Sequence, residues 1–224
     1  MRLIGTELGR MVVLLTQEEW RPTKLSTFDA MGAIKDRYSF AYAPSASIPW
    51  ETLQKDGFKF SQGKFRIRDL DASIQDLTFF SDGIVVNAHN TDEAEAFFQD
   101  LISWAKEFAG VRDLTNVGRK LYVSHVIVEF ERPVNQLINR FQEFSLVLNQ
   151  LMRTTYEFDF QMQLRTLGFH YDHFITPEWH KPTYFSIDRR IGHKYEANRF
   201  FCESPLRTND HLLALRLLEE MLPK

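Results

Sequence analysis

The chain of 224 residues is 44% hydrophobic and 25% charged, a balance typical of a globular protein with a sizeable core. Its net charge of -3 excludes binding to nucleic acid or anionic lipid through overall charge, so such binding would need a local basic patch. A single cysteine excludes an intrachain disulfide, and no apolar stretch approaches the ~20 residues of a membrane span, so we expect a cytoplasmic protein without a membrane partner.

One strand and one helix are expected first. The apolar, β-branched stretch 10–16 predicts a buried strand. Residues 25–44 predict a short helix, which Ser26 or Thr27 can cap, followed by a strand. The aromatic residues that alternate along this strand are Tyr38, Phe40 and Tyr42.

Two hairpins are expected next. In residues 58–68, apolar side chains alternate on both sides of a glycine-containing turn. In residues 73–89 the same pattern surrounds Asp82-Gly83, and an Asp-Gly pair favours the positive φ angles of a type I′ turn. Together the two hairpins predict an antiparallel meander.

Residues 90–110 predict the clearest helix of the chain. Asn90 and Glu93 have the spacing of a capping box, and Gly110 stands where a helix usually ends. Helical spacing places several apolar residues on one face, which we expect to pack on the meander. These residues are Phe97, Leu101, Trp104, Ala105 and Phe108. The polar segment 111–119 then predicts a connector.

The second half of the chain repeats this order of elements. The strands expected there cover 120–131, 156–166, 183–191 and 193–201. Helices are expected at 133–156 and at 208–223, where Thr208 or Asn209 can cap the second helix. The first of these helices has an apolar stripe, expected to pack on the second meander, of Val134, Leu137, Ile138, Phe141, Phe144, Leu148, Leu151 and Met152.

These patterns predict an α+β fold. Each half shows a strand, a helix, an antiparallel meander and a helix, so we expect two successive units whose helices pack on a largely antiparallel sheet. The predicted units are 1–110 and 120–224, joined by the connector 111–119, and one continuous domain is the alternative. The two halves share no evident residue identity, so a structural repeat is a hypothesis only.

A cluster of histidines in residues 168–182 is the first candidate site. Its possible metal ligands are His170, Asp172, His173 and His180. A metal needs three or four ligands that converge at about 2 Å. The spacing matches neither an H-E-x-x-H helix nor a zinc finger. We therefore favour a polar loop, and a metal-dependent hydrolase is the third functional hypothesis.

A basic stretch at 187–199 is the second candidate site. Its possible ligand-binding residues are Arg189, Arg190, His193, Lys194, Tyr195 and Arg199. Guanidinium groups bind phosphate through paired hydrogen bonds, and an aromatic ring offers a stacking surface. The stretch could therefore bind a nucleotide or a nucleic-acid segment. The alternative is a charged hairpin whose arginines face water and neighbouring carboxylates.

Other polar groups have simpler explanations. The cations of the first hairpin, which would protect an exposed edge strand, are Lys59, Lys64, Arg66 and Arg68. Glu157 and Asp159 would lie roughly 7 Å apart along a strand, a spacing open to acid–base chemistry but more typical of a solvated face. We expect His125 to be a hydrogen-bonded core histidine and Cys202 a buried thiol.

We therefore expect a non-catalytic interaction protein that assembles with itself or with a protein partner and needs no cofactor. The aromatic content of 14% and the apolar stripe of 133–156 support this hypothesis. So does the apolar excess of the last helix, in Leu212, Leu213, Leu215, Leu217, Leu218 and Met221. The second hypothesis is a binding protein or enzyme for an anionic ligand. No common nucleotide-binding, hydrolase or zinc motif supports catalysis, but a site without such a motif is not excluded.

Overall fold

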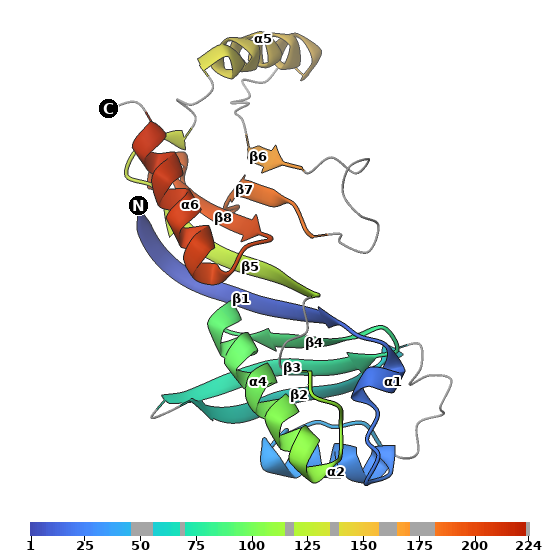
Figure 1. The fold of residues 1–224 in the computed structure, drawn as a ribbon. Helices are drawn as coiled ribbons and strands as arrows, with labels where there is room; N and C mark the ends of the chain where they lie inside the picture. The colour runs from blue at the N-terminus through green and yellow to red at the C-terminus, as the bar shows by residue number, and fades with distance from the viewer. Residues whose placement is uncertain are drawn as a thin grey trace.

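An eight-stranded antiparallel sheet runs through the computed structural model, which describes residues 1–45, 56–67, 70–114, 119–134, 139–156, 165–170 and 182–222 (Figure 1). Its strands are β1 (Arg2–Leu14), β2 (Phe58–Ile67), β3 (Leu70–Phe80), β4 (Gly83–Ala88), β5 (Lys120–Glu129), β6 (Thr166–Phe169), β7 (Phe185–Arg189) and β8 (Arg199–Ser204). The helices are α1 (Gln17–Trp20), α2 (Thr27–Arg37), α4 (Thr91–Phe108), α5 (Asn139–Tyr156) and α6 (Thr208–Met221).

The order of the strands is palindromic. The sheet runs β2-β3-β4-β1-β5-β8-β7-β6, so β1 to β4 correspond in turn to β5 to β8 about the central β1–β5 pair. Gly9 on β1 and Ser124 on β5 face each other at this centre. Gly9 also pairs with Ala88 on β4, as Ser124 pairs with Ser204 on β8. The predicted α+β fold of two strand–helix–meander–helix units is thereby confirmed.

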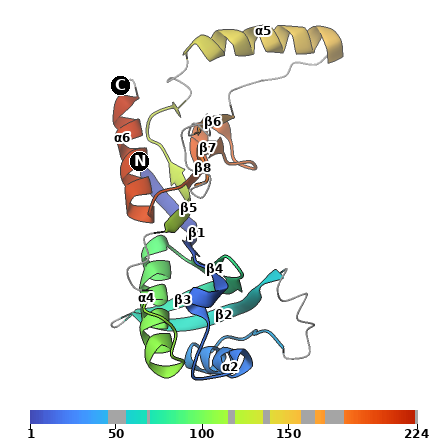
Figure 2. The same ribbon diagram turned by 45° about the vertical axis from the view of Figure 1, so that its right-hand side comes forward.

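Helices α4 and α6 cover one face of the sheet, as the turned view in Figure 2 shows. The strand residues that face these two helices are apolar. They are buried beneath the helices in two hydrophobic clusters. One cluster joins residues between Met11 and Leu114, and the other joins residues between Val126 and Leu222. The predicted boundary at 111–119 stays a prediction, since residues 115–118 lie outside the described part.

The first predicted hairpin is wrong. Residues 58–67 form one continuous strand, and the pairing with β3 extends to its end, where Ile67 faces Leu70. The glycine assigned to a turn, Gly63, serves packing instead: a Cβ there would lie 2.3 Å from the ring of Phe40. A glycine that admits an aromatic ring looks the same in the sequence as a glycine that permits a turn.

The second predicted hairpin is confirmed, but its turn type is not. Phe80 of β3 pairs with Gly83 of β4 across Ser81 and Asp82. Neither of these two residues has the positive φ that a type I′ turn requires. Gly83 is a strand residue whose Cβ would lie 2.6 Å from the carbonyl oxygen of Val13, so the glycine allows β1 to approach.

The helix predicted at 25–44 is confirmed, but the strand predicted after it is wrong. The side chain of Ser26 caps α2 by accepting a hydrogen bond from the backbone N–H of Asp29. The helix ends at Arg37, and Ser39 takes a φ of 50°. Between residues 40 and 45, the described end of this segment, the strand pairing is limited to an isolated bridge between Tyr42 and Ser61.

The helix predicted at 90–110 is confirmed as α4. Its N-cap, Asn90, accepts a hydrogen bond from the backbone N–H of Glu93 (2.9 Å), and Gly110 follows the C-cap with a φ of +72°. The predicted face packs on the sheet, apart from its last residue: Phe97 and Leu101 are buried, whereas Phe108 is 48% exposed.

In the second half, β7 falls within the strand expected at 183–191, whereas β8 overlaps the strand expected at 193–201 only from Arg199 and continues to Ser204. Residues 195–197 form a short 3-10 turn before β8 begins at Arg199. Asn198 holds this bend with a φ of 48° and donates hydrogen bonds to the carbonyl oxygens of Phe130 and Arg132 (2.7 and 2.6 Å). Most of the strand expected at 156–166 lies outside the described residues.

The predicted packing of helix 133–156 is confirmed at Val134, which is buried in the second cluster, but not along α5. Among the described residues, none between Asn139 and Tyr156 belongs to either buried cluster. Figures 1 and 2 both place α5 apart from the sheet and from α6. An apolar stripe indicates only that a helix needs a partner, and here the described core does not supply one.

The predicted cap of the last helix is also wrong. Arg207 is the N-cap of α6, and Thr208 is its first helical residue. Thr208 instead faces Thr91, the first residue of α4, in the buried centre of the molecule. The backbone N–H of Thr91 donates to Thr208 Oγ1 (3.1 Å), and that of Thr208 donates to Thr91 Oγ1 (2.8 Å). The two helices thus cap each other.

Removing one hydroxyl of this pair tests the mutual cap. Thr208→Val keeps the side-chain shape but leaves the buried N–H of Thr91 without its acceptor, so the free energy of unfolding should fall by about 1–3 kcal/mol. Thr208→Ser keeps the hydroxyl and should lose less than about 1 kcal/mol. Denaturant unfolding of the two variants measures the difference. Equal losses would show that the hydroxyl contributes nothing.

Candidate functional site

The basic stretch is divided between different surroundings. Arg189 is buried at the end of β7, where its guanidinium lies 4.7 Å from the ring centre of Phe200. Arg190 forms an ion pair with Glu7 (2.9 Å). Arg199 forms one with Glu129 (3.1 Å). A carboxylate partner offsets the charge of a guanidinium and uses some of its five N–H donors, which weakens its attraction for a phosphate.

The remaining members of the basic stretch lie in the loop between β7 and β8. His193 and Lys194 are exposed, and Tyr195 begins the short 3-10 turn. The structure therefore does not gather the six predicted ligand-binding residues around one point. A small pocket beside Arg189, which Arg165 and Phe200 also line, includes none of the other five predicted residues. Binding of an anionic ligand stays a prediction.

The histidine cluster is described only at its beginning. His170 is exposed, and its ring stacks on that of Tyr184 at a centroid distance of 5.0 Å. Asp172, His173 and His180 lie outside the described residues, as do Glu157 and Asp159. Within the described ranges, no group of three His, Cys, Asp or Glu residues is placed to hold a metal ion. The metal hypothesis stays a prediction.

The face of the sheet opposite α4 and α6 carries polar pairs. His125 lies there rather than in the core, with Nε2 3.1 Å from Glu203, and its side chain is 23% exposed. On the other half of this face, Asp76 accepts hydrogen bonds from Ser61 (2.7 Å) and pairs with Lys59 (3.2 Å). Burial opposes the charge of Asp76, but these partners outweigh it and lower the pKa of the carboxyl group.

Strand β2 lies at the edge of the sheet, as expected, and two of its cations form ion pairs with carboxylates of β3. Arg66 lies 3.0 Å from Asp71 across the β2–β3 pair, in the same way as Lys59 meets Asp76. Arg68 lies outside the described residues. The paired carboxylates offset the charges of Lys59 and Arg66, and Lys64 is exposed. Cys202 is buried as predicted, and burial raises the pKa of its thiol, which leaves it unreactive.

The most distinctive surface of the described chain is apolar. On α5, Phe144, Leu146 and Val147 are 56%, 69% and 52% exposed. The outer face of α6 adds Leu213, Leu217 and Met221, at 54%, 48% and 74%. These six residues are called the C-terminal apolar surface. The sequence predicted the apolar excess of α6 and, through the stripe of 133–156, an interaction surface that includes α5. Phe144 belongs to that stripe, whereas Leu146 and Val147 do not.

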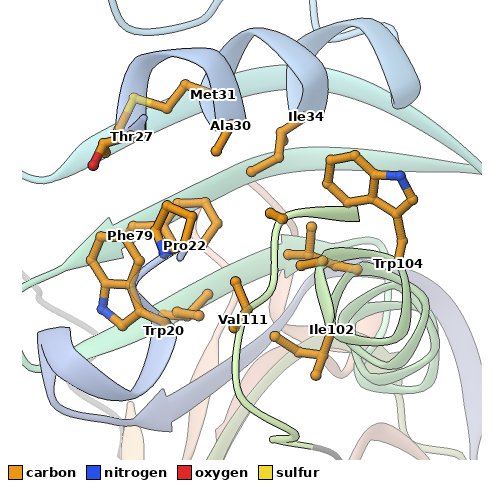
Figure 3. A pocket seen from close by; sticks show the side chains of 14 residues that line it. Trp20, Pro22, Thr27, Ala30, Met31, Ile34, Phe79, Ile102, Trp104 and Val111 are labelled. Atoms are coloured by element: carbon orange, nitrogen blue, oxygen red, sulfur yellow. The ribbon is translucent and has the colours of Figure 1, made fainter. Parts of the chain in front are cut away.

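In the first unit, α2 covers part of the surface of α4. Figure 3 shows Ile34 of α2 directed into a pocket that Ile102 and Trp104 of α4 also line, with Trp20 and Phe79 on its other side. A small apolar pocket remains between these elements, lined mainly by hydrophobic residues. At the end of α2, Asp100 of α4 accepts a hydrogen bond from Tyr38 (2.7 Å) and pairs with Arg37 (3.0 Å). Burial is the main cause that raises the pKa of Tyr38, followed by this bond, so the phenol stays protonated.

Comparison with known proteins adds no function. No family model matches this sequence, and no curated protein matches it. In the part of the chain that the structure describes, no helix is long and apolar enough to span a membrane.

Proposed function

We propose that this chain is a cytoplasmic, non-catalytic assembly protein that self-associates through the C-terminal apolar surface. The exposure of Phe144 and Val147 on α5, together with that of Met221 on α6, is the observation that supports this function. Several large apolar side chains exposed on one helix are typical of a protein–protein interface, and both α5 and α6 carry such a group. No cofactor is part of the proposal.

The distribution of exposed apolar residues favours this function. Of the sixteen large hydrophobic side chains that are exposed in the described residues, eleven belong to the second half of the chain. The first half has almost the same elements but packs α2 on its core. The surplus is therefore a property of one unit, as expected for an interface, and not of the whole surface.

The electrostatics support an anionic-ligand site less well. Arg190 and Arg199, which were expected to bind the ligand, are both paired with carboxylates of the same chain. The buried Arg189 lies against an aromatic ring. An anionic ligand would meet arginines whose charge is already offset by carboxylates, whereas self-association would cover apolar side chains that face water.

Size-exclusion chromatography with light scattering at several protein concentrations tests the proposal. We expect a dimer whose fraction rises with concentration. The double variant Phe144→Glu/Val147→Glu places two charges in the interface, and we expect its dimer to dissociate at least about tenfold more readily. Ile191→Glu is the matched control, because Ile191 is 78% exposed in the β7–β8 turn, outside the proposed interface. A wild-type monomer at every concentration would contradict self-association.

A further inference from the structure

The proposed self-association can be assigned to one pair of helices. We propose that α5 of each copy seats on α6 of a second copy, in the position that α2 occupies on α4 within the first unit. This inference rests on the proposed function and adds the identity of the contacting elements. It follows from the internal two-fold order of the sheet and from the exposure of both helices.

The mutual cap supplies the alignment of α4 with α6. Thr91 and Thr208 are the first residues of the two helices, are bonded to each other and lie 117 positions apart. Neither helix is interrupted, so the same offset relates their later residues. Asp100 on α4 therefore corresponds to Leu217 on α6, and Trp104 corresponds to Met221.

On α4 these two positions hold α2. Asp100 binds Arg37 and Tyr38, at the end of α2, and the Arg37 guanidinium lies 5.4 Å from the ring centre of Trp104. On α6 the same positions carry apolar side chains that are 48% and 74% exposed. The second unit thus has a corresponding position, here called the seat, where a helix can pack on α6. There Leu217 and Met221 replace Asp100 and Trp104, which contact α2 in the first unit.

Chain order identifies α5 as the helix that fits this seat. Helix α2 follows β1 and precedes β2, and α5 follows β5 and precedes β6. Phe144 and Val147 stand three residues apart, so they share a face that can pack against the exposed row of α6. That row is Leu213, Leu217 and Met221, which recur every four residues on one side of the helix.

The position and the exposed residues of α5 favour packing on the α6 of a second copy over packing on the α6 of its own chain. In the structure α5 lies apart from the α6 of its own chain (Figures 1 and 2). It has 18 residues where α2 has 11, or about 27 Å against about 16 Å, so it is longer than the seat that α2 fills. Leu146 is also exposed and points away from the Phe144 face, so α5 offers apolar groups on two sides.

A reciprocal exchange covers both sides of α5. If each α5 packs on the α6 of the other copy, the two α5 helices are brought together by the same two-fold axis, and their second apolar sides can meet. Such an arrangement uses the same surface on both copies and closes as a dimer, without open-ended growth.

Cross-linking between two differently tagged full-length chains tests this contact. One chain carries Val147→Cys and the other Leu217→Cys, and a short bismaleimide joins thiols that lie close together. The native Cys202 is fully buried and should not react. We expect a covalent dimer that contains one chain of each tag. Arg153→Cys is the matched control on α5, since Arg153 is exposed and helical spacing places it on the side away from Phe144 and Val147, and its yield should be several-fold lower.

The other outcomes separate this inference from the proposed function. A chain that carries both Val147→Cys and Leu217→Cys and cross-links within itself, at monomer mass, would show that α5 packs on its own α6. A stable dimer that gives no link between the two tagged chains would retain self-association but overturn the contact. A wild-type monomer at all concentrations would overturn both. Far-UV circular dichroism of every variant verifies that it is folded.

Discussion

Replacing Gly9 with alanine is expected to destabilise the protein by more than about 3 kcal/mol, enough to unfold it if its stability is ordinary. A Cβ at this position would lie 2.0 Å from the carbonyl carbon of Asn90 and 2.3 Å from the backbone nitrogen of Thr91. Both contacts are with backbone at the start of α4, which cannot turn aside as a side chain can. Relief of the clash would have to move α4 away from β1.

The position of Gly9 makes such a movement costly. Gly9 faces Ser124 in the central strand pair, and Thr91 is bonded to Thr208 directly above this centre. A shift of α4 would therefore also strain the start of α6. The corresponding residue on β5 is a serine, whose hydroxyl lies 3.3 Å from Thr208 Oγ1, so α6 leaves room for a side chain.

Denaturant unfolding of Gly9→Ala and Gly5→Ala measures this effect. Gly5 lies in the same strand, but a Cβ there would meet nothing within 4 Å. Since alanine restricts the unfolded chain more than glycine does, Gly5→Ala should change the free energy of unfolding by less than about 1 kcal/mol in either direction. Equal stability of the two variants would show that α4 does not approach β1 as closely as the structure indicates.

The second large effect is expected from pH, through His211. This residue is fully buried near the start of α6, with its ring 5.6 Å from that of Phe185. Among the described residues, neither of its ring nitrogens has a hydrogen-bond partner. Burial, with a smaller contribution from His125, lowers its pKa from 6.5 to about 4.

The direction of the pH effect follows from this shift. Below pH 6.5 the unfolded chain binds a proton on His211 that the folded chain does not bind until about pH 4. The contribution to stability is therefore complete above pH 6.5 and is lost as the pH falls toward 4. We expect this residue to reduce the free energy of unfolding by about 2 kcal/mol between pH 7.5 and pH 5.

Thermal or denaturant unfolding across this range tests the prediction with two variants. His211→Leu should remove this part of the pH dependence, because leucine does not titrate and is close to histidine in size. His193→Leu removes an exposed imidazole instead and should keep the slope of the wild type. Wild type and His211→Leu with parallel profiles would show that His211 is not buried in its neutral form.

The sequence was most informative where periodicity alone was the signal. The helix at α4 was found from its apolar spacing, its cap at Asn90 and its stop at Gly110, which all depend on neighbours in the chain. The same kind of pattern located α2, the β3–β4 hairpin and α6, but it also predicted a strand after α2 and a turn within β2 that the structure does not have. Local patterns were misleading for Gly63 and Gly83, since both are required by residues far away, Phe40 and Val13.

The candidate site was predictable in part. The crowded apolar residues of α6 indicated that this helix had more hydrophobic surface than one contact could cover, and the structure exposes Leu213, Leu217 and Met221. The basic residues also stood out, but composition could not show that Glu7 and Glu129 would pair with Arg190 and Arg199. Such partners come from strands that are brought together only by the sheet.

By itself the sequence determined the class of the fold and where most helices and strands lie along the chain. It could do so because alternation and helical spacing indicate which face of each segment is buried. Only the tertiary structure decided where the segments meet. It placed Gly9 under the start of α4, joined Thr91 to Thr208, and left α5 away from the described core. These features depend on distances between residues that are remote in the chain, and a one-dimensional pattern contains no term for such distances.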